Sequence, residues 1–201
     1  MPANPTATYA SPLHEQAENT KTDFQRRADT IRADNRLTPQ GKQQAIAKLY
    51  TSTRATLDAL GTTYDTGRAT RRATLERNLF GLKAGALSTD TISYRDAMDR
   101  VSSVKDEADL IPILRTANLS GDTILGKAVL ARAFELGEVG TINQYIEATP
   151  DLENDVVALW GLSAPDDFQS MFNNTMFALQ KPTEIAALSD SAINAMADAN
   201  V

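Results

Sequence analysis

The chain has 201 residues, and 42% of them are hydrophobic, which is enough for a core and excludes a chain disordered by composition. It contains no cysteine, which excludes a disulfide framework and a thiolate metal site and favours a reducing compartment. We expect neither a signal peptide nor a membrane span, because the first residues lack a basic start and an apolar core, and no apolar run approaches about 18 residues.

The net charge of −6 is divided unevenly along the chain. Residues 1–88 carry 13 Lys and Arg against 8 Asp and Glu, whereas residues 89–201 carry 7 against 18. Opposite charges on the two halves predict a polar molecule whose ends meet different surroundings, or meet each other in neighbouring copies. This pattern favours a component of an assembly.

The composition predicts an all-α protein, since Ala is abundant, Gly and Pro are few, and no run of alternating β-branched and aromatic residues is present. We predict three regions. Residues 1–10, with two prolines and small polar residues, form a flexible arm. Residues 11–88 form a long, net basic α-helical hairpin, and residues 89–201 form a compact, acidic helical domain with a C-terminal tail.

Two helix starts define the predicted hairpin. Ser11 and Pro12 begin a helix that runs to about Asn35, with Ala17, Phe24 and Ile31 recurring every seventh residue. Thr38 has the side chain of an N-cap, and Pro39 suits the first helical position of a much longer helix. Only a few residues separate the two helices, so they should be antiparallel neighbours.

The long helix carries one narrow apolar stripe. If it runs to Leu82 it is about 65 Å long, which exceeds what a compact domain of this size can bury. Gly61 and Gly67 weaken its middle, so a bend or a split into 39–60 and 62–84 is as well supported as a straight rod. The stripe is richer in apolar bulk than the first helix can match, and part of it should remain for another chain. Its residues are Ile46, Tyr50, Thr53, Leu57, Leu60 and Tyr64, of which we predict Ile46, Tyr50, Leu57 and Leu60 as interaction residues.

A local basic patch follows, formed by Arg68, Arg71, Arg72 and Arg77 with only Glu76 among them. It is either a solvated helix face or a contact surface for an acidic protein or for nucleic-acid phosphates. No aromatic residue is interleaved with the arginines, so a protein contact is favoured over nucleic acid.

The acidic domain should contain several short helices. Ser88 or Asp90 caps one that reaches Val101, and residues 106–109 open another in which Pro112 lies in the first turn or causes a kink. The run DTILGKAVLARAFELG is apolar on nearly every face, as in a buried central helix, and Gly137 ends it.

Two further helices should follow before a helix from the capping-box residues 163–166 to Lys181. The tail beyond it either docks in cis or binds a partner. No repeat can be aligned, so a compact bundle is favoured over a solenoid.

The side chains indicate no enzyme, metal or cofactor. His14 stands alone near an exposed helix start, and the acidic groups at 106–109 and 151–155 lie in first helical turns, where they complement the macrodipole. Neither a phosphate-binding loop nor a hydrolase or metalloprotease motif is present. We therefore expect no catalysis, no membrane partner and no small-molecule substrate.

The runs RLTPQGKQQAIAKLYTSTRATLDAL and NLSGDTILGKAVLARAFELG resemble segments of small helical proteins encoded among the head and structural genes of tailed bacteriophages. The resemblance implies a non-enzymatic scaffold-like or capsid-associated protein, made in the bacterial cytoplasm, that contacts itself, a coat protein or another virion protein. Scaffolding proteins of such phages often end in a basic helix, whereas this C-terminus is acidic. The alternative is a cytosolic helical adaptor or regulator that binds a peptide or protein in a groove.

Overall fold

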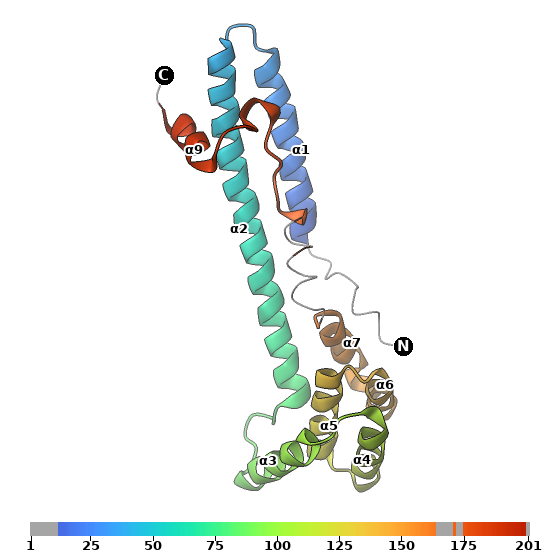
Figure 1. Ribbon diagram of the computed structural model, residues 1–201. Coiled ribbons are helices and arrows are strands. Elements are labelled where there is room, and N and C mark those ends of the chain that lie inside the picture. Colours follow the sequence, from blue (N-terminus) through green and yellow to red (C-terminus); the bar gives the residue numbers. More distant parts are fainter. Residues whose placement is uncertain (1–11, 164–170, 172–174, 200–201) are drawn as a thin grey trace. The chain divides into compact units, whose positions relative to one another are not determined.

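The structure is a computed structural model that describes residues 12–163, 171 and 175–199 (Figure 1). Helices joined by turns account for the secondary structure of these residues, with no strand among them, which confirms the all-α class. The predicted arm 1–10 and most of the predicted helix 163–181 lie outside the described residues. None of the described helices is long and apolar enough to cross a membrane.

The chain forms two compact units. We call them the α1 unit, within Ala10–Gly67 and Pro165–Val201, and the α5 unit, within Arg68–Ala164. Helix α2 (Pro39–Phe80) contributes residues to both. It is uninterrupted across Gly61 and Gly67, so the alternative of two separate helices was wrong.

The α1 unit begins with α1 (Pro12–Ala33), which a short loop connects to α2. The hydroxyl of Thr38 accepts the Gly41 N–H at 3.1 Å, as the N-cap prediction required. The ring of Phe24 packs edge-on against the ring of Tyr50, with centroids 6.5 Å apart, so apolar side chains hold the two helices together.

Residues 175–199 of the α1 unit are here called the C-terminal segment. It contains the 3₁₀ turn η2 (Thr183–Ile185) and α9 (Asp190–Asp198). Ile185 and Ile193 are buried in one cluster with Phe24 and Tyr50. This differs from the predicted division at residue 89, which assigned the tail to the acidic domain, because these apolar side chains bury themselves on α1 and α2 instead.

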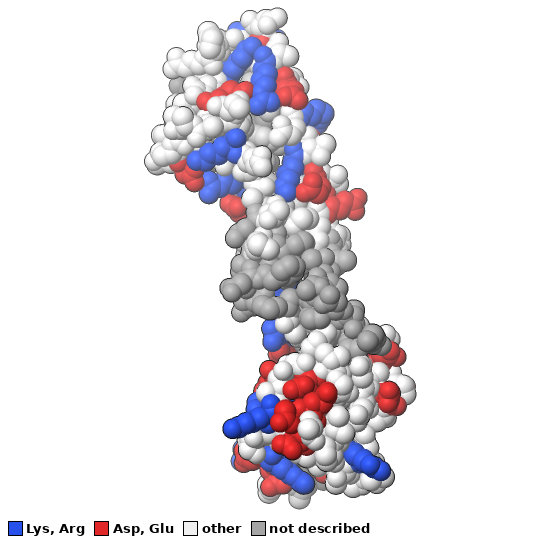
Figure 2. Space-filling view, turned by 45° about the vertical axis from the view of Figure 1, so that its right-hand side comes forward, with Lys and Arg blue, Asp and Glu red and all other residues white. Residues whose placement is uncertain are grey.

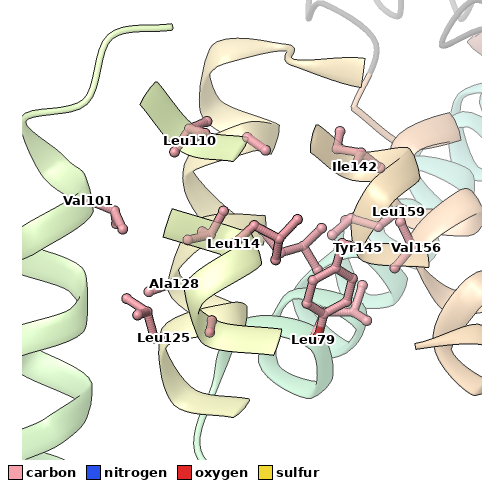
Figure 3. Close-up of a cluster of buried hydrophobic side chains, with 14 of the residues drawn as sticks. Leu79, Val101, Leu110, Leu114, Leu125, Ala128, Ile142, Tyr145, Val156 and Leu159 are labelled. Atoms are coloured by element: carbon pink, nitrogen blue, oxygen red, sulfur yellow. The ribbon is translucent and has the colours of Figure 1, made fainter. Parts of the chain in front are cut away.

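The α5 unit surrounds one central helix. Its elements are α3 (Ser88–Ser102), α4 (Glu107–Ser120), α5 (Thr123–Leu136), α6 (Val139–Ala148), η1 (Pro150–Leu152) and α7 (Glu153–Gly161). Helix α5 contacts α3, α4 and α6, and seven of its residues are buried, which confirms the predicted central helix and the compact bundle. Leu75 and Leu79 of α2 join the same core. Figure 3 shows Leu79 among the side chains of this core.

Local chemistry marks the helix ends in the α5 unit. The carboxylates of Asp106 and Asp122 cap α4 and α5 by accepting backbone N–H groups at 3.1 and 2.9 Å. Gly121 and Gly137 end the same helices with φ of +67° and +76°, a conformation that favours glycine. Pro112 lies inside α4, beyond the predicted first turn.

Glu107 was predicted to complement its own helix, but its carboxylate accepts the N–H of Thr141 at 2.6 Å, in the first turn of α6. A Cβ at Gly140 would lie 2.4 Å from a Glu107 oxygen, so the absence of a side chain at position 140 makes this contact between helices feasible.

Candidate interaction surfaces

The predicted apolar stripe of α2 is buried within the chain. Ile46 and Leu57 have no exposed surface, Tyr50 is 4% exposed, and Leu60 is partly buried. Our expectation that part of this stripe remains for another chain therefore needs correction. The physical reason is that α1 covers one side of the stripe and the C-terminal segment covers what α1 leaves.

Phe177 shows how closely the C-terminal segment fits α2. Its ring lies against Gly61, where an added Cβ would be 3.4 Å from the ring atoms. Gly61 was predicted to destabilise the helix. Because it has no side chain, it leaves room for the ring of Phe177 against the backbone of α2. Phe177 is 5% exposed and packs in one cluster with Ala17, Leu57 and Tyr64.

His14 belongs to the same aromatic cluster. Its ring centroid lies 4.8 Å from that of Tyr64 and 6.0 Å from that of Phe177, and the two partner rings are 5.7 Å apart. Burial lowers the pKa of the imidazole, because the charged form loses solvation. His14 was expected at an exposed helix start, whereas the structure gives it a packing role.

Ion pairs fix the C-terminal segment at η2. The Arg32 guanidinium donates to both carboxylate oxygens of Glu184, at 2.7 and 3.1 Å, in the paired geometry typical of strong arginine contacts. The side-chain amide of Gln43 donates to the Glu184 carbonyl at 2.7 Å. The bond from Arg32 lowers the pKa of the Glu184 carboxyl to about 2.

A second polar contact fixes the start of α9. Asp190 accepts from Arg54 of α2 at 2.8 Å and pairs with Lys181 at 2.7 Å. These two cations lower the pKa of Asp190 to about 2, with Lys181 as the larger influence. Within the α1 unit, Glu184 and Asp190 of the C-terminal half therefore pair with Arg32 and Arg54 of the N-terminal half, and Asp190 pairs with Lys181 as well.

Because of these ion pairs, the charge must be counted by folded unit and not by half of the sequence. Counted by folded unit, residues 10–67 and 165–201 carry 9 Lys and Arg against 12 Asp and Glu, and residues 68–164 carry 11 against 14. Each unit therefore has a net charge of −3. Both signs are intermixed over both units on the face shown in Figure 2. The expected contact between neighbouring copies assumed one basic and one acidic half, and the two folded units do not differ in net charge.

The predicted arginine patch is mostly engaged inside the α5 unit. Arg68 donates to the Leu162 carbonyl at 2.7 Å, at the end of α7, and Arg71 lies 3.9 Å from Asp155. Arg72 pairs with Glu76 along α2 at 2.8 Å. Arg77 is exposed. The patch thus connects α2 to α7, which weakens the case for phosphate binding.

Nothing in the sequence indicated that Phe177, Glu184 and Asp190 complete the α1 unit, and it was left open whether Ile185 and Ile193 of the tail dock in cis. A usable signal was present in the spacing of apolar residues in the tail, which left cis docking open. The spacing does not show which helix the tail packs on. An apolar face of this size fits α2 as well as it fits the helices that precede the tail in the sequence.

Hollows occur in both units among the described residues. A groove of about 640 Å³ in the α1 unit has charged walls, including Arg54, Asp58 and Asp65. A cavity of about 540 Å³ in the α5 unit lies between α2, α5 and α6, and Lys127 and Tyr145 contribute to its lining. In the described part of the chain, no three His, Asp or Glu side chains gather in a way that would hold a metal ion.

Comparisons with known proteins returned no matching family model, no similar curated protein and no similar solved structure.

Proposed function

We propose that this chain is a non-enzymatic structural or assembly protein of a bacteriophage particle, made in the bacterial cytoplasm, that contacts itself or another virion protein through its helices. The observation that carries the proposal is the use of α2 by both units. Tyr64 lies in a core of the α1 unit and Leu79 in the core of the α5 unit, on one continuous helix. A shared helix suits a protein whose task is to hold two contact modules together.

The resemblance to phage head proteins supports the same proposal. Its first run, residues 36–60, includes the N-cap and the buried stripe of α2, and its second run, residues 118–137, includes α5. Both runs thus contribute a main helix, one to each unit.

Because the α2 stripe is covered, contacts with other chains would use other surfaces. Large apolar side chains are exposed on the α5 unit at Leu87, Ile92 and Leu119, which are 68%, 67% and 82% exposed. Such side chains are candidates for contact with a coat protein, whose approach would remove them from water.

The test is the composition of particles released by cells that encode the chain. Density-gradient fractions should contain its peptides at a constant ratio to the coat protein, as mass spectrometry would measure. A peptide signal spread over fractions without particles would contradict the proposal. A coat contact through α4 would also be lost in Leu119→Asp but kept in the matched exposed change Arg115→Asp.

The alternative function is a helical adaptor or regulator that binds a peptide or protein partner. The groove of the α1 unit favours it, because Arg54, Asp58 and Asp65 on its walls suit the polar groups of a peptide. A monomeric protein absent from all particles would favour this alternative.

A further inference from the structure

The cavity of the α5 unit, here called the α5 cavity, has the size of a small-molecule site. Its volume of about 540 Å³ falls within the usual range of roughly 300 to 1,000 Å³. The end of α2, the turn between α4 and α5 and the end of α6 contribute its lining. The assembly role proposed above makes no use of this cavity.

Small residues and one aromatic ring shape the cavity wall. Ala117, Gly126 and Ala148 leave space, while Leu152 and the ring of Tyr145 add apolar surface. A Cβ at Gly126 would lie 3.7 Å from Tyr145 Cε2, so a larger side chain there would occupy the space beside the ring. Burial raises the pKa of the Tyr145 phenol, which therefore stays neutral near pH 7.

Two lysines give the cavity a positive side. The Lys127 ammonium donates to the carbonyls of Gly81 and Asn78 at 2.7 and 3.3 Å, and it forms no ion pair with a described carboxylate. Burial lowers its pKa, and so does the nearby charge of Lys83, which also lines the cavity. Among the described lining residues the only carboxylate is that of Asp122, which caps α5.

The Lys127 ammonium has two carbonyl acceptors at the end of α2 but no ion pair with a described carboxylate, so a negative charge beside it remains favourable. The positive charge of Lys83, on the same lining, acts on Lys127 in the opposite sense. An incoming carboxylate would relieve the repulsion between the two lysines, and an aromatic body could pack on the apolar wall.

We propose that the α5 cavity binds a small aromatic monoanion, with its carboxylate at Lys83 and Lys127 and its ring against Tyr145 and Leu152. The site differs from our expectation of no small-molecule ligand. It is independent of the assembly role, so either can fail alone.

Naphthoate is a suitable probe, titrated into the full-length protein and followed by amide NMR. We expect saturable shifts at Gly121 and Gly126, with a Kd below about 1 mM. Naphthamide, which has the same rings without the charge, should bind about tenfold more weakly. Shifts that do not saturate, or equal affinity for both probes, would overturn the proposal.

Variants separate binding from support of the fold. Lys83→Gln changes an exposed side chain and should weaken naphthoate binding by about 3- to 10-fold with an unchanged Tm. Lys105→Gln is the matched control, since Lys105 is exposed in the same unit and does not line the cavity. Equal affinities for these two variants would contradict the proposal.

Ala148→Phe tests the place of binding. Ala148 is exposed on the cavity lining, so a phenyl group there should block the apolar wall and reduce affinity at least tenfold without burying a charge. Full affinity in Ala148→Phe would place naphthoate elsewhere and overturn the assignment.

Discussion

At the scale of single residues, Gly61 and Gly67 test whether the C-terminal segment depends on a flat helix surface. The two glycines lie on α2 in the α1 unit, and a Cβ would meet Phe177 at position 61 and nothing within 4 Å at position 67. Gly67→Leu should raise the free energy of unfolding by about 0.5 to 1 kcal/mol, because leucine favours helix. Gly61→Leu should lower it by about 1 to 3 kcal/mol, because Phe177 must move.

Urea denaturation followed by circular dichroism measures both changes. If Gly61→Leu is as stable as Gly67→Leu, Phe177 does not rest on α2 as described.

His14 should make the stability of the α1 unit depend on pH. Its pKa is lowered in the folded chain from the ordinary 6.5, so the unfolded chain binds more protons as pH falls below that value. Stability should therefore be full above about pH 6.5 and fall as pH decreases towards the folded pKa. Thermal unfolding between about pH 5 and 8 should show this slope in the wild type and a smaller slope in His14→Phe.

Protonation of Glu184 and Asp190 should also lower the stability of the α1 unit, but at a lower pH than protonation of His14. Both carboxyls have folded pKa values of about 2, below their ordinary values, so their stabilisation is present above about pH 4.5 and is lost as pH falls towards 2. His14→Phe should leave the loss of stability below about pH 4.5 unchanged, which distinguishes the effect of the imidazole from that of the ion pairs.

At the scale of elements, Phe134 tests the central position of α5. Its ring meets Phe80 and Trp160 edge-on, with centroids 5.5 and 5.7 Å away, so α5 joins the ends of α2 and α7. Phe134→Ala should cost about 3 kcal/mol, near the lower end for a phenylalanine because the ring is partly exposed. Phe134→Leu, which retains apolar bulk, should cost less, and Trp160 fluorescence reports both unfolding transitions.

Helix ends and the buried central helix could be predicted from the sequence, whereas the packing of the C-terminal segment could not. Caps predicted the start of α2 at Thr38 and the end of α5 at Gly137, because cap geometry depends on a few neighbouring residues. Asp106 was placed in the first turn of α4, whereas the structure has it as the N-cap. The burial of α5 was predictable because its apolar residues cover nearly every face. The docking of Ile193 was not predictable, since it depends on a surface on α1 and α2 more than 140 residues away along the chain.

In the candidate sites too, features set by neighbouring residues could be predicted, and contacts between distant parts of the chain could not. The α2 stripe was predicted as a contact surface, and Ile46 and Leu57 are buried, but the part that α1 leaves was assigned to another chain instead of the C-terminal segment. The α5 cavity was not predicted, because Lys83, Lys127 and Tyr145 line one cavity only after helices far apart in the sequence pack together.

At the scale of the whole molecule, the C-terminal segment decides whether the α2 stripe is available to other copies. Ile193 is 1% exposed, and an aspartate there would place a charge in the cluster with Phe24 and Tyr50. Ile193→Asp should release α9 and expose part of the stripe, so we expect concentration-dependent self-association in sedimentation velocity. Ala195→Asp, at an exposed position of the same helix, should sediment like the wild type.

The order in which the ribosome makes the chain gives the C-terminal segment a further consequence. Between Phe80, where α2 ends, and Ala199 lie over a hundred residues, which take roughly 6 to 24 s to translate at about 5 to 20 residues per second. During that interval the nascent α2 presents Tyr50 and Leu57 without the side chains that finally cover them. Neighbouring ribosomes on one message would hold several such chains close together, so co-translational encounter is the moment when another copy competes best with the chain's own C-terminus.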